Sequence, residues 1–507
     1  MADFYTEILE GKVRRHDRSR FELKLDYLLR PKATVSRYAL ELYFFVPKTL
    51  LPSKRNYSRE QFYNDFSSLV RFKTPQIPLE ILANPKSKKS SWRRMKDVMT
   101  LAPAQRDLAL VRELKLFSNI FRSQIRDSVF GFIREAKNLN TKHGAMTLEE
   151  DLRKFSGLIE ENLKLERKME VLFRDASCSA EVLDVLLAVD EFCIMSLEYY
   201  ISALLLELDK KSDFRVDLAE ARSSLEGLLA QEIASRREKG YLTCGTEEDS
   251  ASHEAFIYKK GIFKKWSMDI LLLSLSREDV GERYGYLAGV LGAGVAMLIY
   301  MLLFIWQGSA FVVNSLPFVL ASVVFYIIKD RIKEYFKEFY HREFSHWFPD
   351  YKVNLIHPET QTKIGHITES FSFLSRRNLP KKVTEMRMED LSVLEREGRP
   401  EKVFRYHKEV FLKNRAGFEE DFWNGLNDIL RFDVSSFLRR ASEPRTQNFV
   451  FDASRGEPLG MKVPKAYHIN IVVKMSDMLE SGEIETRWNR IRLVVDKNGI
   501  ERMDQIV

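Results

Sequence analysis

The stretch that decides the class of protein runs from Tyr284 to Ile328 and reads YGYLAGVLGAGVAMLIYMLLFIWQGSAFVVNSLPFVLASVVFYII. These 45 consecutive residues contain no Asp, Glu, Lys or Arg. A helix needs about 20 apolar residues to cross the ~30 Å hydrocarbon core of a bilayer, because each residue advances it by about 1.5 Å. The stretch is too long for one crossing and fits two crossings with a tight connection. We therefore predict a two-helix transmembrane hairpin over residues 284–328.

The connection between the two crossings is predicted at Gln307-Gly308-Ser309, which gives spans near 285–306 and 310–328. A second turn candidate is Asn314-Ser315, which is followed by Pro317. The prediction of two crossings does not depend on which turn is used.

Small residues recur along one side of the first predicted span. They are Gly285, Gly289, Gly292, Ala293 and Ala296. Residues of this size at this spacing let two helix backbones approach closely in lipid. The face is expected to pack either on the second span of the same hairpin or on another subunit of a homo-oligomer. A pore lined by the glycines is a third interpretation, although no ionisable side chain inside the span marks an ion path.

Basic residues flank the apolar stretch on both sides. They are Lys259, Lys260, Lys264, Lys265, Arg277 and Arg283 before it, and Lys329, Arg331, Lys333, Lys337 and Arg342 after it. The positive-inside rule places both flanks in the cytoplasm. An interfacial aromatic belt on that side is expected from Tyr284, Tyr286, Tyr335, Tyr340 and Trp347. We predict an integral membrane protein, located in a bacterial cytoplasmic membrane because the hairpin connection is short, with both termini cytoplasmic.

The fold class expected for the chain is an α+β membrane protein. The hairpin would lie between a cytosolic helical-bundle region and a C-terminal mixed α+β domain. The predicted parts are a basic mixed α/β domain (1–100), a helical bundle (101–240), a linker with a juxtamembrane helix (241–283), the hairpin (284–328) and a cytosolic α+β domain (329–507).

Apolar periodicity places the elements inside these parts. Period-2 alternation predicts strands over 21–29, 37–46 and 468–475, and a β-hairpin around Pro358. The apolar runs of 490–507 are predicted to form a second β-hairpin with its turn at Asn498-Gly499. Spacing of three and four predicts helices over 104–239, near 59–72 and near 417–440. The basic, aromatic segment 257–276 is expected either to lie in the membrane interface or to pack on the cytosolic domains.

Composition excludes several classes. The chain has 507 residues, of which 45 % are hydrophobic and 30 % charged, so it is not disordered by composition. Three cysteines without metal-ligand spacing exclude a disulfide scaffold. The first twenty residues lack an apolar core, so a cleavable signal peptide is not expected. The common nucleotide, zinc, hydrolase and calcium motifs are absent, so no catalytic residue, metal or cofactor is predicted.

A basic segment at 84–96 is the first candidate binding site. Its residues are Lys86, Lys88, Lys89, Trp92, Arg93, Arg94 and Lys96. An exposed loop of this composition can grip anionic lipid headgroups or nucleic-acid phosphates, or can simply be solvated. Because the chain carries a membrane stretch, headgroups are the expected partner and nucleic acid is not.

Two other constellations are weaker candidates. Four of the nine histidines, His341, His346, His357 and His366, follow the hairpin closely, but only Glu338 and His341 have ligand-like spacing. The carboxylates Asp184, Glu191 and Glu198 recur every seven residues on one helix and are interpreted as its solvated side.

These observations favour a non-catalytic function, a membrane-anchored scaffold, sensor or regulator. The alternatives are a membrane-bound enzyme acting on a lipid or nucleotide at the cytosolic face, and an oligomeric pore-type effector. Residues 1–100 carry 21 basic and 11 acidic residues (+10), and residues 101–250 carry 21 and 28 (−7). The opposite charges suggest that these two parts dock on each other. The partners expected are the bilayer, its anionic headgroups and further copies of the chain.

Overall fold

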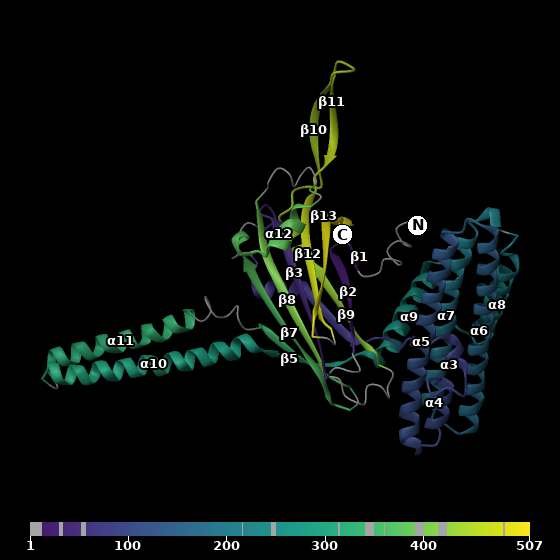
Figure 1. Cartoon of the computed structure of the whole chain (residues 1–507), viewed down its shortest axis with the longest axis horizontal. Helices are drawn as coiled ribbons and strands as arrows, with labels where there is room; N and C mark the ends of the chain where they lie inside the picture. The colour runs from purple at the N-terminus through teal and green to yellow at the C-terminus, as the bar shows by residue number, and fades with distance from the viewer. Residues whose placement is uncertain are drawn as a thin grey trace. The chain divides into compact units, whose positions relative to one another are not determined.

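Strands from both ends of the chain share one sheet in the computed structural model (Figure 1). β3 (Val35–Pro47) pairs with β8 (Glu401–Lys413) on one side and β12 (Tyr467–Met478) on the other. The eight strands are antiparallel neighbours in the order β14-β13-β12-β3-β8-β7-β6-β5. The remaining strands are β5 (Ser274–Asp279), β6 (Tyr351–Ile356), β7 (Lys363–Leu374), β13 (Ile484–Asp496) and β14 (Gly499–Gln505).

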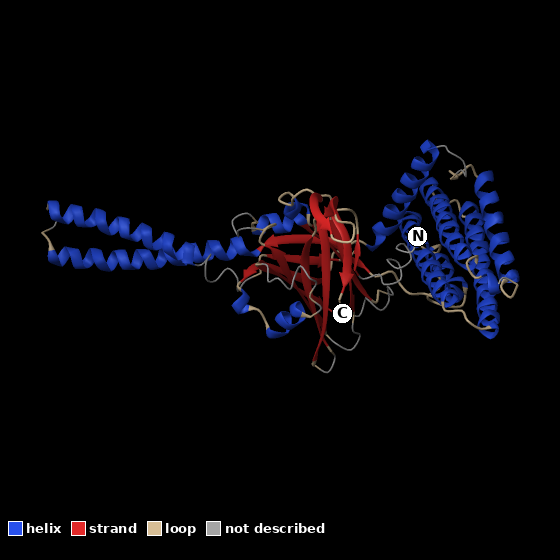
Figure 2. Cartoon of the chain, turned by 90° about the horizontal axis from the view of Figure 1, so that it is seen from above, coloured by secondary structure: helices blue, strands red, loops and turns tan. Residues whose placement is uncertain are grey.

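The structure describes residues 13–29, 34–51, 57–214, 216–244, 250–312, 315–339, 349–358, 360–389, 391, 400–413, 423–479 and 482–506. The chain divides into two compact units. The sheet unit comprises Met1–Arg71, Leu273–Gly417 and Gly425–Val507, and the helical unit comprises Phe72–Leu272 and Phe418–Asn424. Figure 2 distinguishes the strands (red) of the first from the helices (blue) that make up the second.

A second sheet faces the first across an aromatic core. Its order is β1 (Val13–Arg15), β2 (Arg20–Leu28), β9 (Gly425–Asp433) and β4 (Phe66–Phe72). The ring of Phe44 on β3 lies 4.7 Å from Phe404 on β8 and 4.9 Å from Phe432 on β9. Phe62 of α2 (Arg59–Asp65) is fully buried against the same rings. This core holds the two sheets together.

The opposite face of the large sheet is covered by α12 (Lys381–Met388), which follows the short 3-10 helix η6 (Arg376–Asn378). Val383 and Met386 of α12 pack on Tyr43 and Phe45. Because β3 is buried on both faces, it carries the continuous apolar run Leu42–Val46 instead of simple alternation.

Two helix predictions in this unit were wrong in part. The helix expected near 59–72 ends at Asp65 and continues as β4, and the helix expected near 417–440 is β9 followed by the single turn α15 (Ser435–Leu438). Asp428 occupies an interior position of β9, so the period-2 pattern is interrupted and the spacing of four between Leu426 and Leu430 mimics a helix. Residues 417–422 lie outside the described residues.

The strand predictions were confirmed at 21–29, 37–46, 468–475 and 490–507, and in the β6–β7 hairpin around Pro358. The turn between β13 and β14 uses Gly499, whose φ is 145°. A Cβ there would lie 2.1 Å from the Arg18 carbonyl oxygen, so the position requires glycine.

Four long helices form most of the helical unit and confirm the helical prediction for 104–239. They are α5 (Pro103–Lys137), α6 (Lys142–Asp175), α7 (Ala180–Leu208) and α8 (Ala219–Glu238). The shorter elements are α3 (Leu79–Ala83), α4 (Ser91–Val98), η2 (Ser212–Phe214), α9 (Ser250–Met268) and η3 (Asp269–Leu271).

The segment expected either in the membrane interface or on the cytosolic domains forms α9, η3 and the start of β5. Its helix α9 packs on α5 and α7. Asn119 of α5 donates to the Ser267 carbonyl oxygen at 2.6 Å, and Lys259 pairs with Glu191 of α7 at 2.7 Å. These contacts favour the second alternative.

Two further parts of the chain lie outside the two larger sheets. The helices α10 (Val280–Ala310) and α11 (Leu316–Phe339) lie side by side, and β10 (Arg445–Asp452) with β11 (Glu457–Pro464) forms a separate two-stranded ribbon (Figure 1).

Candidate membrane hairpin

The α10–α11 hairpin is inserted between two neighbouring strands. β5 leads into α10, β6 follows α11, and Asp279 of β5 faces Tyr351 of β6 in the antiparallel register. Both ends of the hairpin therefore lie at one point of the sheet.

Among the described residues, one helix is long and apolar enough to cross a membrane. It covers Arg283–Ala310, and its most apolar 18-residue window has a mean hydropathy of 2.3 and is only 11 % buried. In α11 the apolar residues run from Leu316 to Ile328 and are followed directly by Lys329, Asp330 and Arg331. The second crossing stays a prediction.

The turn was placed wrongly in the favoured prediction. α10 continues through Gln307-Gly308-Ser309 to Ala310, and α11 begins at Leu316. The Ser315 hydroxyl accepts the backbone N–H of Phe318 at 3.4 Å, as an N-terminal cap does. The second candidate, with Ser315 and Pro317, fits this arrangement, although Asn314 itself lies outside the described residues.

Gln307 explains why a polar residue sits inside the apolar helix. Its side chain is fully buried, and its amide donates to the Phe318 carbonyl oxygen and to the Ser322 hydroxyl at 2.8 Å, both on α11. A polar side chain in lipid is stabilised when it bonds across helices. Gln307 therefore fastens α10 to α11 near the tip.

Some residues of the small-residue face pack within the hairpin and others do not. Gly285, Gly292 and Ala296 are buried, and a Cβ on Gly292 would lie 2.7 Å from the Phe336 Cβ of α11. Gly289 and Ala293 are half-buried, and no described atom lies within 4 Å of a Cβ on Gly289. The hairpin itself thus uses Gly292 and Ala296, while the Gly289 side is open.

Aromatic and basic residues are spread along the hairpin: Tyr284 and Tyr286 lie in the first two turns of α10, whereas Lys329 lies beside Tyr300. Tyr284, Tyr286 and Tyr335 are exposed, and the Lys329 ammonium lies 3.8 Å from the Tyr326 ring centre. Tyr340 and Trp347, the other expected members of an aromatic belt, lie outside the described residues.

Asp350 joins the hairpin to the sheet unit. Its carbonyl oxygen accepts the N–H groups of Val280 and Gly281, and its carboxylate accepts from Arg59 at 3.2 Å, Tyr63 at 3.0 Å and the Phe371 N–H at 2.7 Å. Burial raises the pKa of Asp350 despite these donors. Asp350 therefore links the start of α10, through its backbone carbonyl, to α2 and β7, through its carboxylate.

The basic segment 84–96 is only partly a free surface. Its second half is the helix α4 and not a loop, because Ser90 caps it. Arg94 pairs with Glu113 of α5 at 2.7 Å, Arg93 pairs with Asp97, and Lys96 lies over the Trp92 ring. The side chains with no partner among the described residues are those of Lys86, Lys88 and Lys89, all exposed.

The histidines are not brought together as a site within the described residues. His341 and His346 lie outside them. His357 is buried in the turn after β6, and His366 stacks on Phe411 at 4.7 Å, where burial and then Lys352 lower its pKa. The described residues contain no group of three or more His, Cys, Asp or Glu that could hold a metal ion.

The acidic stripe on α7 is not its solvated side, as the sequence suggested. Asp184 is exposed, but Glu191 is buried and pairs with Lys259 of α9, and Glu198 pairs at 2.7 Å with the buried Arg236 of α8. The stripe is covered because α8 and α9 bring cations to it.

A buried acidic cluster in the helical unit was missed by sequence reasoning. Glu166 of α6 is 3 % exposed, and burial followed by the charge of Asp190 raises its pKa far above the ordinary value. Asp190 itself pairs with Lys239 at 2.5 Å, and Glu232 pairs with Arg167 at 2.5 Å. Apolar spacing along α6 gives no signal for it, since the partners come from α7 and α8.

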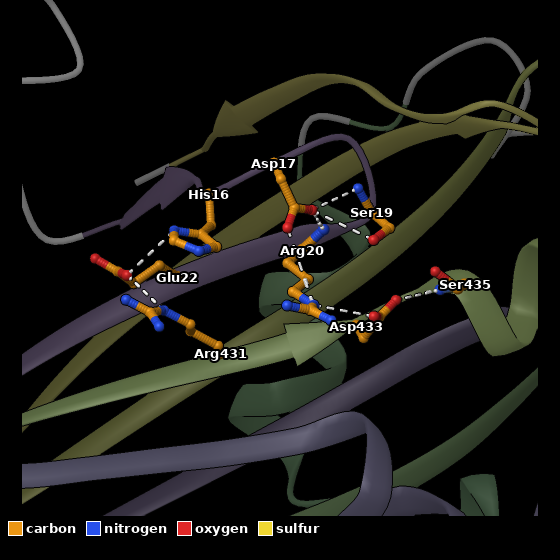
Figure 3. Close-up of polar contacts among 8 residues, drawn as sticks. All are labelled: His16, Asp17, Ser19, Arg20, Glu22, Arg431, Asp433 and Ser435. Atoms are coloured by element: carbon orange, nitrogen blue, oxygen red, sulfur yellow. Dashed lines mark hydrogen bonds and ion pairs between the residues drawn. The ribbon is translucent and has the colours of Figure 1, made fainter. Parts of the chain in front are cut away.

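Charged side chains also form cross-strand pairs on the small sheet (Figure 3). Arg20 faces Asp433 and Arg431 faces Glu22 in the β2–β9 register, with N–O distances of 3.0 and 2.8 Å. Burial opposes the shift, but the hydrogen bonds from Ser435 and Arg20 hold the pKa of Asp433 below its ordinary value. The pairs fix strand register.

A small pocket lies beside α2 and α15. Its volume is about 150 Å³, and it is lined by Leu50, Leu51, Tyr57, Gln61, Ser436, Phe437, Arg439 and Arg440. Pockets for drug-sized ligands are about 300–1,000 Å³. This pocket is therefore too small for a ligand of that size.

No family model, curated protein or solved structure matches this chain. What the chain does must therefore be inferred from its own residues.

Proposed function

We propose that the chain is a membrane-anchored scaffold, sensor or regulator, held in a bacterial cytoplasmic membrane by the α10–α11 hairpin. The hairpin crosses the bilayer twice, and both termini and the two large units are cytoplasmic. One observation carries the proposal: the apolar side chains of α10 face outward. Leu291, Leu298 and Ile305 are 70, 62 and 66 % exposed. Water would penalise so large an apolar surface, and lipid would not.

The charges and polar groups of the hairpin support the same orientation. Arg277 precedes α10, Arg283 lies in its first turn, Lys329 to Lys333 follow the apolar part of α11, and the described tip residues carry no charge. Both N–H groups of the Gln307 amide are bonded within the hairpin. The free Lys86, Lys88 and Lys89 are a second point at which the protein can meet anionic headgroups, and the open Gly289 side is a surface for a further copy.

Vesicle flotation tests the anchor. Leu291→Asp, Leu298→Asp and Ile305→Asp combined place three carboxylates on the lipid-facing side, each at a cost of about 2.5–3.5 kcal/mol at the centre of a span. The parent is expected to float with vesicles, and the triple variant to remain at the bottom of the gradient. The matched control is Leu108→Asp, Val171→Asp and Leu206→Asp, on exposed positions of the helical unit, which is expected to float like the parent. A parent that does not float, or a triple variant that does, contradicts the anchor.

Cysteine labelling tests the two crossings. Cys244 is exposed, and Cys178 and Cys193 are buried, so Cys244 serves as a natural cytoplasmic reporter. In Ser309→Cys the added thiol near the tip is expected to react with an impermeant maleimide in intact cells, whereas Cys244 reacts only after permeabilisation. A tip that is protected in intact cells and labelled after permeabilisation refutes both crossings, because the tip would then not reach the far side of the membrane; vesicle flotation still tests the anchor.

A further inference from the structure

The β10–β11 ribbon, which we call the arm, has no support from the rest of the described chain. It forms a two-stranded sheet of its own, and nearly every residue from Arg445 to Pro464 is exposed. Phe449 is 77 % and Phe451 68 % exposed, and both lie on one face. An isolated two-stranded ribbon is marginal in water. A partner that pairs with the arm would therefore stabilise it.

The two edges of the arm differ. The Lys465 N–H donates to the Pro444 carbonyl oxygen at 2.8 Å, and this bond sets the alternation along the ladder. Arg445, Gln447, Phe449 and Phe451 consequently direct their N–H and C=O groups away from β11. The outward positions of β11 include Pro458 and Pro464, which have no N–H to donate. The β11 edge, with proline at two of its four outward positions, is largely closed to pairing, whereas the β10 edge, with an N–H at all four, is open.

We propose that the open β10 edge pairs antiparallel with β10 of a second copy of this chain. The result is a four-stranded sheet, β11-β10-β10′-β11′, whose outer edges are both closed by prolines. One open edge per arm allows a two-fold pair, and the prolines on the outer edges disfavour further addition. The proposal goes beyond membrane anchoring and does not depend on it.

The sequence of β10 is complementary to itself in this arrangement. A pairing centred on Asn448 places Arg445 opposite Phe451 of the second copy and Gln447 opposite Phe449. Arg445 has no partner among the described residues, and its guanidinium would gain a cation–π contact with Phe451. The two phenylalanines of each arm would lie on one face of the shared sheet, where they shield one another from water.

A matched pair of proline substitutions tests the edge. Gln447 and Lys462 face each other in the arm and both direct their N–H outward. Gln447→Pro removes a donor from the open edge, and Lys462→Pro removes one from the closed edge. Light scattering of the detergent-solubilised full chain is expected to give twice 59.4 kDa for the parent and for Lys462→Pro, and 59.4 kDa for Gln447→Pro.

A covalent trap gives a second readout. In the Cys244→Ser background, Asn448→Cys places two thiols across the two-fold axis, in a pair without backbone bonds whose Cα atoms lie about 4.5 Å apart. That separation suits a disulfide, so a crosslinked dimer is expected on mild oxidation. A monomeric parent without a crosslink refutes the proposal. So does a dimer that survives Gln447→Pro and is lost on Gly289→Leu, since the copies would then meet through α10. Because Gln447→Pro is expected to float with vesicles as the parent does, failure of this proposal is distinct from failure of the anchor.

Discussion

Removal of one partner of the buried ion pair between the two sheets is expected to destabilise the sheet unit strongly. Lys408 of β8 and Asp428 of β9 are both 0 % exposed, and their charged atoms lie 2.5 Å apart. Ser68 accepts from Lys408 and donates to Asp428, both at 2.8 Å, and Tyr27 donates to Asp428 at 3.1 Å. The pair joins the large sheet to the small one.

The magnitude follows from what each substitution leaves behind. Lys408→Met leaves the Asp428 carboxylate with two hydroxyl donors and no close cation, and breaking a buried pair in this way costs about 3–5 kcal/mol. Replacing both charges, as Lys408→Met with Asp428→Leu, regains about 1–4 kcal/mol of desolvation. The Tyr27 and Ser68 hydroxyls lose Asp428 as their acceptor in the double variant, and each loss costs about 1–3 kcal/mol, which offsets this gain. The double variant should therefore lose much less free energy of unfolding than the sum of the losses of the two single variants.

Thermal unfolding of the detergent-solubilised protein, followed by near-ultraviolet circular dichroism, measures the effect. The single variant Lys408→Met is expected to lower the midpoint by roughly 6–20 °C, at about 2–4 °C per kcal/mol. Lys413→Met, an exposed lysine at the end of the same strand, is the control and should shift stability by less than about 0.5 kcal/mol. If the double variant loses the sum of the two single losses, the pair does not act as a unit and the reasoning is wrong.

Two further predictions concern the hairpin and the helical unit. Gly292→Leu is expected to force α10 away from Phe336, at a cost of about 1–3 kcal/mol as in overpacked cores. It should lower the unfolding midpoint, whereas Gly294→Leu, with no described atom within 4 Å of its Cβ, should not; equal shifts would contradict the packing. The pKa of Glu166 is raised by burial, so its contribution to stability is complete below its unfolded pKa and is lost as pH rises through the folded value. Glu166→Gln should therefore stabilise the helical unit relative to the parent increasingly as pH rises above the ordinary carboxyl pKa, and parallel stability–pH curves would refute this.

Local patterns predicted the elements that are buried on one side. The long helices of 104–239 and the strands around Asn498-Gly499 follow from spacing and turn chemistry alone. The same rules failed at β9, because a charge at an interior position is compatible with a strand only if Lys408, twenty residues earlier in the sequence, lies opposite it.

Long-range pairing lies outside what periodicity can show. Nothing in residues 35–47 signals that β3 will lie between β8 and β12, several hundred residues away. In the candidate membrane hairpin, too, some features can be predicted from local sequence and others depend on long-range pairing. The apolar character of α10 is written in consecutive residues, whereas the Gln307 bonds, the Asp350 junction and the Glu166 cluster depend on which helices and strands become neighbours.

The register between β5 and β6 shows that the candidate anchor is an insertion between two paired strands. Since Asp279 and Tyr351 already face each other, everything between them is, for the sheet, one long loop. The entropic cost of closing a loop grows only slowly with its length. A two-residue turn such as Asn-Gly could join the same two strands without changing their register. An engineered form without residues 280–350 would keep every strand pairing of the large sheet, so the candidate anchor can be removed independently of the sheet.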